Sequence, residues 1–365
     1  MSENENILSY FSEMNDPRID RTRRHNFEDI IFIAIASVLS GVESWNEMQQ
    51  YGEMKKDWLE SFLELPHGIP SHDTFNRFFA SLDSEVFESS FLNWVKSIHK
   101  KTDGEVISID GKTMRGSRSQ GCKSATHIVS AWADQNELVL GQLKVNEKSN
   151  EITAIPKLLE ALLLEGCIVT IDAMGCQKNI AKKIVKKKAD YVLAVKENQK
   201  ELFEDIKDSF RVLPPEDYHE ELDYGHGRIE TRKCSIITDL SLVECASKWE
   251  GLSSIIRIER ERLLKSTGKK ETETSVYIST LTSAESIASS IRKHWGIENK
   301  VHWVLDVAFN EDLSRKRAGN AAKNFTNLNR IALNLLKQDK TKIGIKGKRK
   351  MAGWNNDFII RLIKN

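Results

Sequence analysis

The sequence predicts an α/β protein in which a mixed sheet, with helices on its faces, follows a helical N-terminal region. Residues 1–100 repeat apolar side chains at helical spacing, and residues 106–197 alternate strand-like with helix-like stretches. We therefore expect a helical domain over 1–100 and an α/β domain over 101–335. A β-rich insertion is expected at about 198–280, and a basic C-terminal tail over 336–365.

The N-terminal region is expected to form several short helices. An apolar run over residues 30–39 follows helical spacing, and Ser71 can cap a later helix. That later helix carries His72, Asn76 and Arg77, which would face a DNA groove if the helices form a helix-turn-helix unit. The alternative is a helical domain that only packs on its neighbour.

The stretch from residue 106 to 197 has the order strand, strand, strand, helix, strand, helix, strand. Its first strand ends at Asp110, and a later buried strand ends at Asp172. This order fits an RNase H-like mixed sheet, in which carboxylates at the ends of two neighbouring strands lie side by side. A buried carboxylate must be paired, hydrated or bound to a metal, so both residues are candidate functional groups. A turn or capping role is the structural alternative.

A third candidate carboxylate, Glu298, lies in an expected helix over residues 284–309. If Asp110, Asp172 and Glu298 converge, three negative charges share one cleft, which is unfavourable without cations. Oxygen ligands of this kind suit Mg²⁺ or Mn²⁺. Two such ions can activate a water or a 3′ hydroxyl against a phosphodiester. We expect Asp110 to bridge both ions, Asp172 to complete one site and Glu298 the other.

A zinc site is the rival interpretation of the same helix, because His294 and His302 lie four residues on either side of Glu298. The His-Glu-x-x-His pattern of zinc hydrolases is missing. Successive steps of four residues also drift around a helix, which leaves the two histidines about 80° apart. The pattern therefore favours magnesium over zinc, and an ordinary surface role for Glu298 is the third possibility.

The net charge of +1 is unevenly distributed, since residues 314–365 carry +12 and residues 1–313 carry −11. A basic segment on an acidic body indicates a polyanionic partner such as DNA; the alternative is a solvated tail. We expect Lys348, Arg349 and Lys350 to contact DNA phosphates.

The cysteine pattern predicts a reduced, cytoplasmic chain. The five cysteines are an odd number without Cys-x-x-Cys spacing, so neither a disulfide framework nor a thiolate zinc site is expected. The longest apolar run is about a dozen residues, too short to span a bilayer. Residues 1–6 are polar and acidic, which does not predict a signal peptide.

Three segments together resemble the signatures of DDE transposases of bacterial insertion sequences, in the branch that includes the H-repeat-associated proteins. They are residues 109–115, 172–177 and 294–299. Further similarity lies at residues 147–156, 226–228 and 302–312. The N-terminal region resembles the associated domain of the same family.

This resemblance implies an RNase H-like catalytic core that carries out Mg²⁺-dependent DNA transposition. The implied catalytic acids are Asp110, Asp172 and Glu298. It also implies a homodimer in a synaptic complex with terminal inverted repeats and target DNA, in the bacterial cytoplasm and on the nucleoid when bound to DNA. The alternatives are an inactive remnant that only binds DNA, or a two-metal nuclease without strand transfer.

Several polar residues near these motifs are candidate DNA contacts. They are Lys112, Arg115, His226, Arg228, Arg232, His294, Asn299 and His302. Many relatives in the wider superfamily place Tyr, Arg and Lys around the glutamate, at positions that match Ile291, His294 and Leu305, so those contacts do not transfer. Trp249 and Trp303 could stack on a displaced base, although we favour core packing for both.

Overall fold

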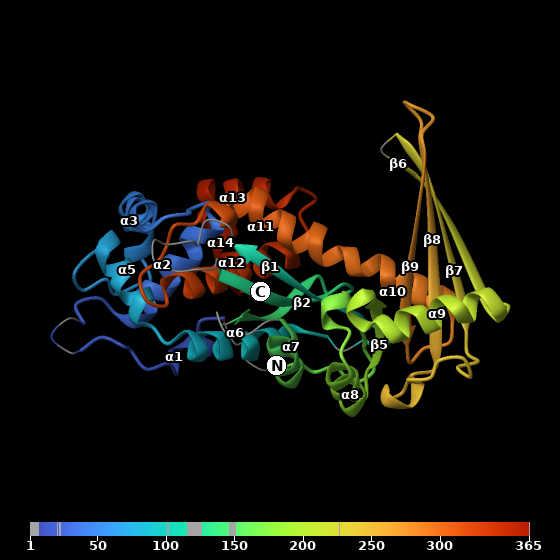
Figure 1. Cartoon of the computed structure of the whole chain (residues 1–365). Helices are drawn as coiled ribbons and strands as arrows, with labels where there is room; N and C mark the ends of the chain where they lie inside the picture. The colour runs from blue at the N-terminus through green and yellow to red at the C-terminus, as the bar shows by residue number, and fades with distance from the viewer. Residues whose placement is uncertain are drawn as a thin grey trace.

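The computed structural model describes residues 7–19, 21, 23–100, 102–114, 126–145, 151–225 and 227–364. The molecule is elongated and has three regions (Figure 1). Helices from both ends of the chain form the first region, a sheet with covering helices forms the middle, and a β-rich extension projects at the far end. None of the described helices is both long and apolar enough to cross a membrane.

The N-terminal region is helical, as predicted. Its helices are α1 (Ser9–Ser12), α2 (Phe27–Leu39), α3 (Trp45–Met54), α4 (Lys56–Glu60), α5 (His72–Ser81) and α6 (Ser84–Ile98). Helix α2 is buried over nearly its whole length, which explains its continuous apolar sequence. Ser71 caps α5, as expected from the sequence, and its hydroxyl accepts a hydrogen bond from the Thr74 amide at 3.3 Å.

The C-terminal segment completes this helical region. It forms α12 (Ala321–Gln338), α13 (Ile345–Trp354) and α14 (Asn356–Lys364). Helix α12 packs on α2, α5 and α6, and α13 packs on α2. The expected basic tail over 336–365 is therefore wrong for the described residues of that range. Helix α14 has an apolar face, and burial of that face stabilises the packed helix even though the segment is rich in basic residues. The buried residues of this face are Phe358, Ile359, Leu362 and Ile363.

A single mixed sheet of nine strands runs through the middle and far regions, in the order β3-β2-β1-β4-β5-β9-β8-β7-β6. Its strands are β1 (Val106–Met114), β2 (Thr126–Ala133), β3 (Leu138–Val145), β4 (Ile168–Ile171), β5 (Asp190–Val195), β6 (Asp217–Gly225), β7 (Arg228–Ile237), β8 (Ser254–Leu264) and β9 (Lys270–Ser279). Strands β1, β4 and β5 are parallel, and their other neighbours are antiparallel. The predicted mixed sheet is confirmed, and β9 joins the insertion to β5.

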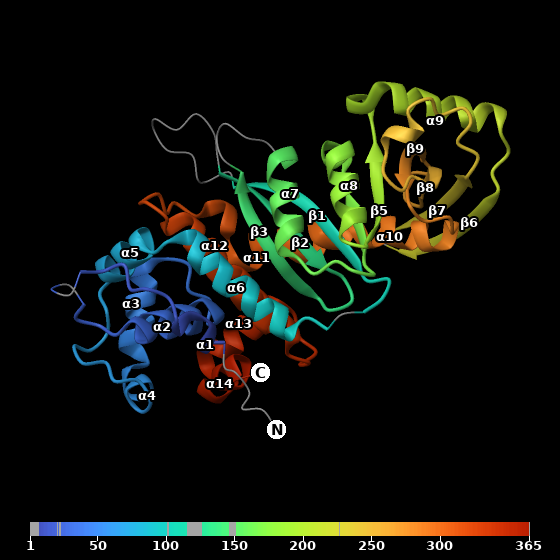
Figure 2. The same ribbon diagram turned by 90° about the horizontal axis from the view of Figure 1, so that it is seen from below.

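Helices cover both faces of the sheet (Figures 1 and 2). Helices α7 (Glu151–Ala161) and α8 (Lys178–Lys186) lie side by side on one face. Helix α10 (Ala284–Ile297) crosses the other face and contacts β1, β4 and β2. Helix α9 (Lys200–Val212) lies against β8 of the insertion, and α11 (Trp303–Phe309) continues beyond α10.

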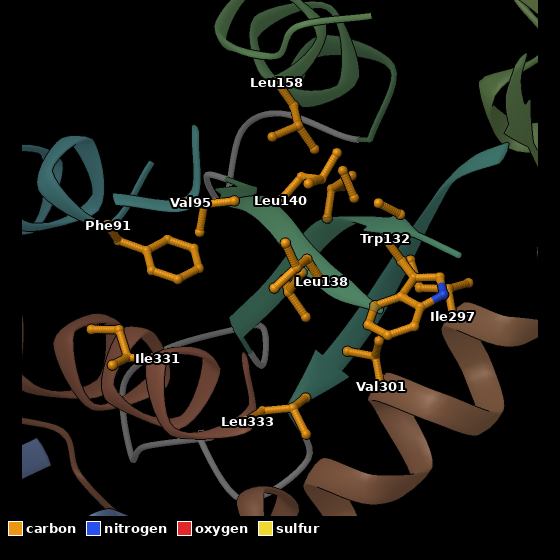
Figure 3. Packing of buried hydrophobic residues seen from close by; sticks show 14 of the residues in the cluster. Phe91, Val95, Trp132, Leu138, Leu140, Leu158, Ile297, Val301, Ile331 and Leu333 are labelled. Atoms are coloured by element: carbon orange, nitrogen blue, oxygen red, sulfur yellow. The ribbon is translucent and has the colours of Figure 1, made fainter. Parts of the chain in front are cut away.

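The core between the sheet and α10 determines where the helical segment with Glu298 lies. Trp132 of β2 is fully buried and faces Ile297 and Val301 of that segment (Figure 3). A side chain at Gly296 would meet the Trp132 indole at 3.3 Å, so glycine allows the helix to approach the strand closely. This packing places Glu298 beside β1, which carries Asp110, and β4, which Asp172 follows.

Candidate active site

Asp110 and Asp172 lie at the same edge of the sheet, at equivalent positions in two adjacent parallel strands. Ile109 of β1 pairs with Ile171 of β4, and each aspartate follows directly in its chain. The prediction that the first strand ends at Asp110 is wrong, because β1 continues to Met114 by pairing with β2, whereas β4 ends at Ile171 as expected. The register of the two parallel strands still makes the two carboxylates neighbours. This register agrees with the prediction from the sequence that Asp110 and Asp172 lie side by side.

Asp172 begins a single turn of 3₁₀ helix, Ala173–Gly175, which links β4 to α8. Its Oδ1 accepts hydrogen bonds from the amides of Met174 at 3.1 Å and Gly175 at 3.4 Å. A side chain at Gly175 would clash with Ile171, so the turn requires glycine there. Asp172 is thus a capping residue as well as a candidate ligand.

Glu298 starts a π-helical turn, Glu298–His302, between α10 and α11. The sequence predicted one uninterrupted helix, and a π-turn adds a residue without breaking the helical path. The turn brings His302 to Asp110, with Nδ1 of the histidine 3.3 Å from Oδ2 of the aspartate. Such turns occur often at functional sites.

The three carboxylates influence one another electrostatically. Burial raises the pKa of Asp172, and the charges of Glu151 and Asp110 raise it further. Burial also raises the pKa of Glu298, and the charge of Asp110 adds to this effect. For Asp110, burial is opposed by the hydrogen bond and charge of His302, and its pKa is lowered. The negative charge of Asp110 therefore reaches both other acids.

This donor set fits a divalent cation in its chemistry. Three carboxylates supply hard oxygen ligands, and the raised pKa values of Asp172 and Glu298 mark negative charge that lacks a neutralising partner. In the described residues, no three His, Cys, Asp or Glu side chains stand close enough to hold a metal as they are. Asp110 turns to His302 and Asp172 to the amides of its own turn, so metal binding would require their side chains to rotate.

The two histidines on this helical segment have different partners. His294 Nδ1 is hydrogen-bonded to the Thr170 hydroxyl at 2.9 Å, whereas His302 lies at Asp110. Burial lowers the pKa of His294. Ile291 and Leu305, which occupy positions of DNA contacts in many relatives, are buried. His294 and His302 therefore connect this helical segment to the sheet, which changes their expected role.

Glu151 and His127 are site residues that sequence reasoning missed. His127 Nε2 lies 2.6 Å from Glu151 Oε1, and His127 Nδ1 lies 2.8 Å from the Thr113 hydroxyl. A side chain at Gly111 would meet the ends of the Glu151 and His127 side chains, so both would have to move to admit a larger residue directly after Asp110. Glu151 lies within the motif at 147–156, but no spacing rule connects it to Asp172.

Lys112 was expected to contact DNA, and the structure corrects this. The side chain is buried, and Nζ is paired with Asp306 and hydrogen-bonded to the His302 carbonyl at 3.5 Å. Glu311 lies 3.8 Å from the same nitrogen and is itself paired with the buried Arg330. A buried ammonium needs fixed counter-charges, so this network holds Lys112 inside and ties β1 to the segment after Glu298.

The same correction applies to part of the C-terminal cluster. Lys348 donates to the carbonyls of Leu336 at 2.9 Å and Asp339 at 2.6 Å. Arg349 is buried and donates to the Val38 carbonyl at 2.9 Å. Both cations bind carbonyl groups at the C-terminal ends of helices inside the protein and do not face solvent. Lys350, in contrast, is exposed.

Three of the expected DNA contacts line one cavity of about 540 Å³ between the insertion and α10. They are Arg228, Arg232 and Asn299. Seven cationic and four acidic side chains line this cavity, so its surface is net positive. Arg115 and His226, which were also expected to contact DNA, lie outside the described residues.

The two tryptophans considered for base stacking differ in exposure. Trp249 is 3% exposed and packs in the core, as favoured from the sequence. Trp303 is 61% exposed on the first turn of α11, so our preference for core packing is wrong there. Trp295, on the preceding helix, is also exposed, and the two indoles lie on either side of Glu298 in the chain.

The fold and the acidic edge of the sheet agree with what sequence comparison finds. The family described as Transposase DDE domain matches residues 101–335, and the family described as DDE_Tnp_1-associated matches residues 8–95. The chain belongs to the DDE transposase family.

Two relatives cover nearly the whole chain. A candidate transposase of Escherichia coli O157:H7, YncI, is 40% identical over 97% of this chain and 93% of its own. The H repeat-associated candidate transposase YhhI of Escherichia coli strain K12 is 38% identical over 98% of this chain and 97% of its own. Among solved structures, the piggyBac transposase synaptic complex with hairpin DNA matches with a TM-score of 0.43 and 11% identity, over 97% of this chain and 76% of that one.

Proposed function

We propose that this protein is an active DNA transposase that binds the ends of an insertion sequence and catalyses divalent-metal-dependent strand cleavage and strand transfer. The observation that carries the proposal is the register of β1 and β4, which sets Asp110 beside Asp172. The influence of the Asp110 charge on Glu298 supports a third member. The order of the first five strands supports an RNase H-like core.

Asp110, Asp172 and Glu298 are proposed to hold two divalent ions. When bound, such ions lower the pKa of an attacking hydroxyl and stabilise the leaving oxygen of a phosphodiester. His302 holds Asp110 in the free protein, and its imidazole remains beside the carboxylate to orient it. The Lys112 network holds the strand of Asp110 against the segment that follows Glu298.

The positive cavity beside the π-turn is proposed to bind the DNA backbone near the cleaved bond. Arg232 Nη2 pairs with Glu230 at 2.7 Å, whereas its buried Nη1 makes no hydrogen bond among the described residues and lies 3.9 Å from Glu221 and 3.8 Å from Asp223. A guanidinium N–H that lacks a hydrogen bond favours a ligand that accepts one, and phosphate oxygens are suitable acceptors that would compete with these two carboxylates. Asn299 connects this cavity to Glu298, its neighbour in the chain. Two copies are proposed to assemble on paired DNA ends.

Substitution of the acids tests this proposal. Asp110→Asn, Asp172→Asn and Glu298→Gln should each lower Mg²⁺-dependent cleavage of the element's ends by more than about 100-fold. Loss of a residue that only hydrogen-bonds to a metal ligand lowers activity by about 10–100-fold, and loss of the ligand itself should lower it further. The matched control is Glu285→Gln, at an exposed residue in the first turn of α10, the helix that leads to Glu298. This variant should cleave normally.

Each alternative has its own outcome in this assay. Undiminished cleavage in any of the three acid variants would overturn the assignment. Tight binding to the ends without cleavage in Mg²⁺ or Mn²⁺ identifies a remnant that only binds DNA. Cleavage without joining to target DNA identifies a nuclease that lacks strand transfer.

A further inference from the structure

Helix α8, which follows Asp172, is basic on two sides. Residues 178–188 contain six lysines and no acidic residue. Three of these lysines face α7 and its flanking loop. Lys183 pairs with Glu160, Lys187 donates to the Leu162 carbonyl at 3.0 Å, and Lys188 lies 3.3 Å from Glu165. The charges on this side are thus met by partners inside the protein.

The other side of α8 carries Lys178, Lys182 and Lys186, here called the α8 lysine stripe. All three are exposed. Within the described ranges, none of them has an ion pair within 4.0 Å or a side-chain hydrogen bond. Positions four apart on a helix rise by about 6 Å and turn by about 40°, so the three lysines form a row that winds about 80° around the helix. None of the three has a direct carboxylate partner among the described residues, although the charge of Glu160 on α7 interacts with Lys186.

The stripe is held in a defined position relative to the acidic site. Helix α8 starts six residues after Asp172, and its opposite face buries Ile180 and Ile184 in the core. The connection is fixed by two amide side chains from the end of β5. Asn198 donates to the Ala173 carbonyl at 2.6 Å, and Gln199 donates to the Cys176 carbonyl at 2.9 Å. The backbone of the helix that carries the stripe is therefore held in place relative to Asp172.

The segment that follows β5 adds no net charge. Lys196 and Lys200 are exposed where β5 ends, beside the end of β4, but the exposed Glu197 and Glu201 follow them directly in the chain. Burial lowers the pKa of Lys187, and the charges of Lys96 and Lys183 lower it further, against the opposing effect of Glu160. A row of like charges is unfavourable in the free protein, and a polyanion that displaces its counterions relieves it.

We infer that the α8 lysine stripe binds backbone phosphates of duplex DNA adjacent to the bond held at the acidic site. This inference rests on the proposed function. It places the surface for non-specific DNA binding on the face of the sheet opposite α10 (Figure 2). The C-terminal helices, where Lys348 and Arg349 are buried, are not part of that surface. The contacts are to phosphate, so they carry no sequence preference.

The salt dependence of binding tests the inference on the full chain. A fluorescein-labelled duplex of arbitrary sequence is titrated by anisotropy over a range of salt concentrations, without divalent ions. Each phosphate contact contributes about 0.9 to the slope of log affinity against log salt. The variant with Lys178→Gln, Lys182→Gln and Lys186→Gln should lose up to about 2.7 from that slope. The corresponding triple Arg variant should keep the wild-type slope.

The paired lysines of the same helix supply the control. Lys183→Gln combined with Lys188→Gln removes two cations that already have carboxylate partners, and should leave the slope within about 0.5 of wild type. An unchanged slope in the stripe variant, or an equal loss per charge in both variants, overturns the inference. Wild-type protein that does not bind DNA at low salt instead overturns the proposed function itself. Circular dichroism confirms that each variant is folded.

Discussion

Asp110 connects most of the site's interactions at the scale of single residues. Its backbone lies in β1, its carboxylate lies 3.3 Å from His302, and its charge raises the pKa of Asp172 and Glu298. Gly111, directly after it, leaves space that the ends of the Glu151 and His127 side chains occupy. The Asp-Gly pair thus supplies a charge and lets these two side chains approach the strand.

Trp303 is a large side chain left exposed directly after the π-turn that begins at Glu298. An indole left in water on the turn after the π-helix offers a flat surface for an unpaired base. Trp303→Ala should weaken binding to a duplex with a single-stranded end by about 1–3 kcal/mol per stacked base, and leave binding to a fully paired duplex unchanged. Anisotropy on the two probes measures the difference. Trp354→Ala, at an exposed tryptophan of α13, is the control, and equal affinities for wild type and Trp303→Ala would contradict a stacking role.

At the scale of elements, the π-turn and the C-terminal helices depart most from sequence expectation. Helical periodicity places residues on faces, but it does not reveal where one extra residue widens a turn. The turn matters because it begins at Glu298 and ends at His302. The C-terminal helices were not predicted for another reason. A count of charges does not distinguish an exposed lysine from a buried lysine that donates hydrogen bonds to the last carbonyls of a helix, as Lys348 does.

Arg349 shows what the C-terminal helices contribute. Its guanidinium donates to the Val38 carbonyl at the end of α2 and lies over the Phe309 ring at 4.1 Å. Arg349→Met leaves buried carbonyls without donors and should reduce the free energy of unfolding by about 3 kcal/mol. Lys350→Gln, at the exposed neighbour, should leave it within about 0.5 kcal/mol. Urea denaturation compares the two, and equal stabilities would mean that the guanidinium contributes no net hydrogen bonding.

At the scale of the whole molecule, much of the architecture could be predicted because it follows from local patterns. Alternating apolar strands predicted the mixed sheet, and the two strands expected to end in aspartate predicted that Asp110 and Asp172 lie side by side, although β1 continues past Asp110 to Met114. The partners of individual charges could not be predicted, because they depend on which distant segments meet. Lys112 meets Asp306 from a distant helix, and Glu151 approaches Gly111 from the start of α7.

The arrangement places two positive surfaces around one acidic edge. The cavity between the insertion and α10 lies on one face of the sheet, and the α8 lysine stripe lies on the other. Acidic side chains elsewhere neutralise much of the remaining positive charge, which keeps the net charge at +1. Long-range attraction of DNA would therefore depend on these local surfaces and not on overall charge.

Mn²⁺ binding is the measurement that shows whether Asp110, Asp172 and Glu298 bind divalent metal together. Titration followed by electron paramagnetic resonance measures the affinity of the folded protein without DNA. Wild type and the Glu285→Gln control should bind Mn²⁺ equally, and Asp110→Asn, Asp172→Asn and Glu298→Gln should each weaken binding by more than about 10-fold. Wild-type Mn²⁺ affinity in any one of these three variants would contradict the account.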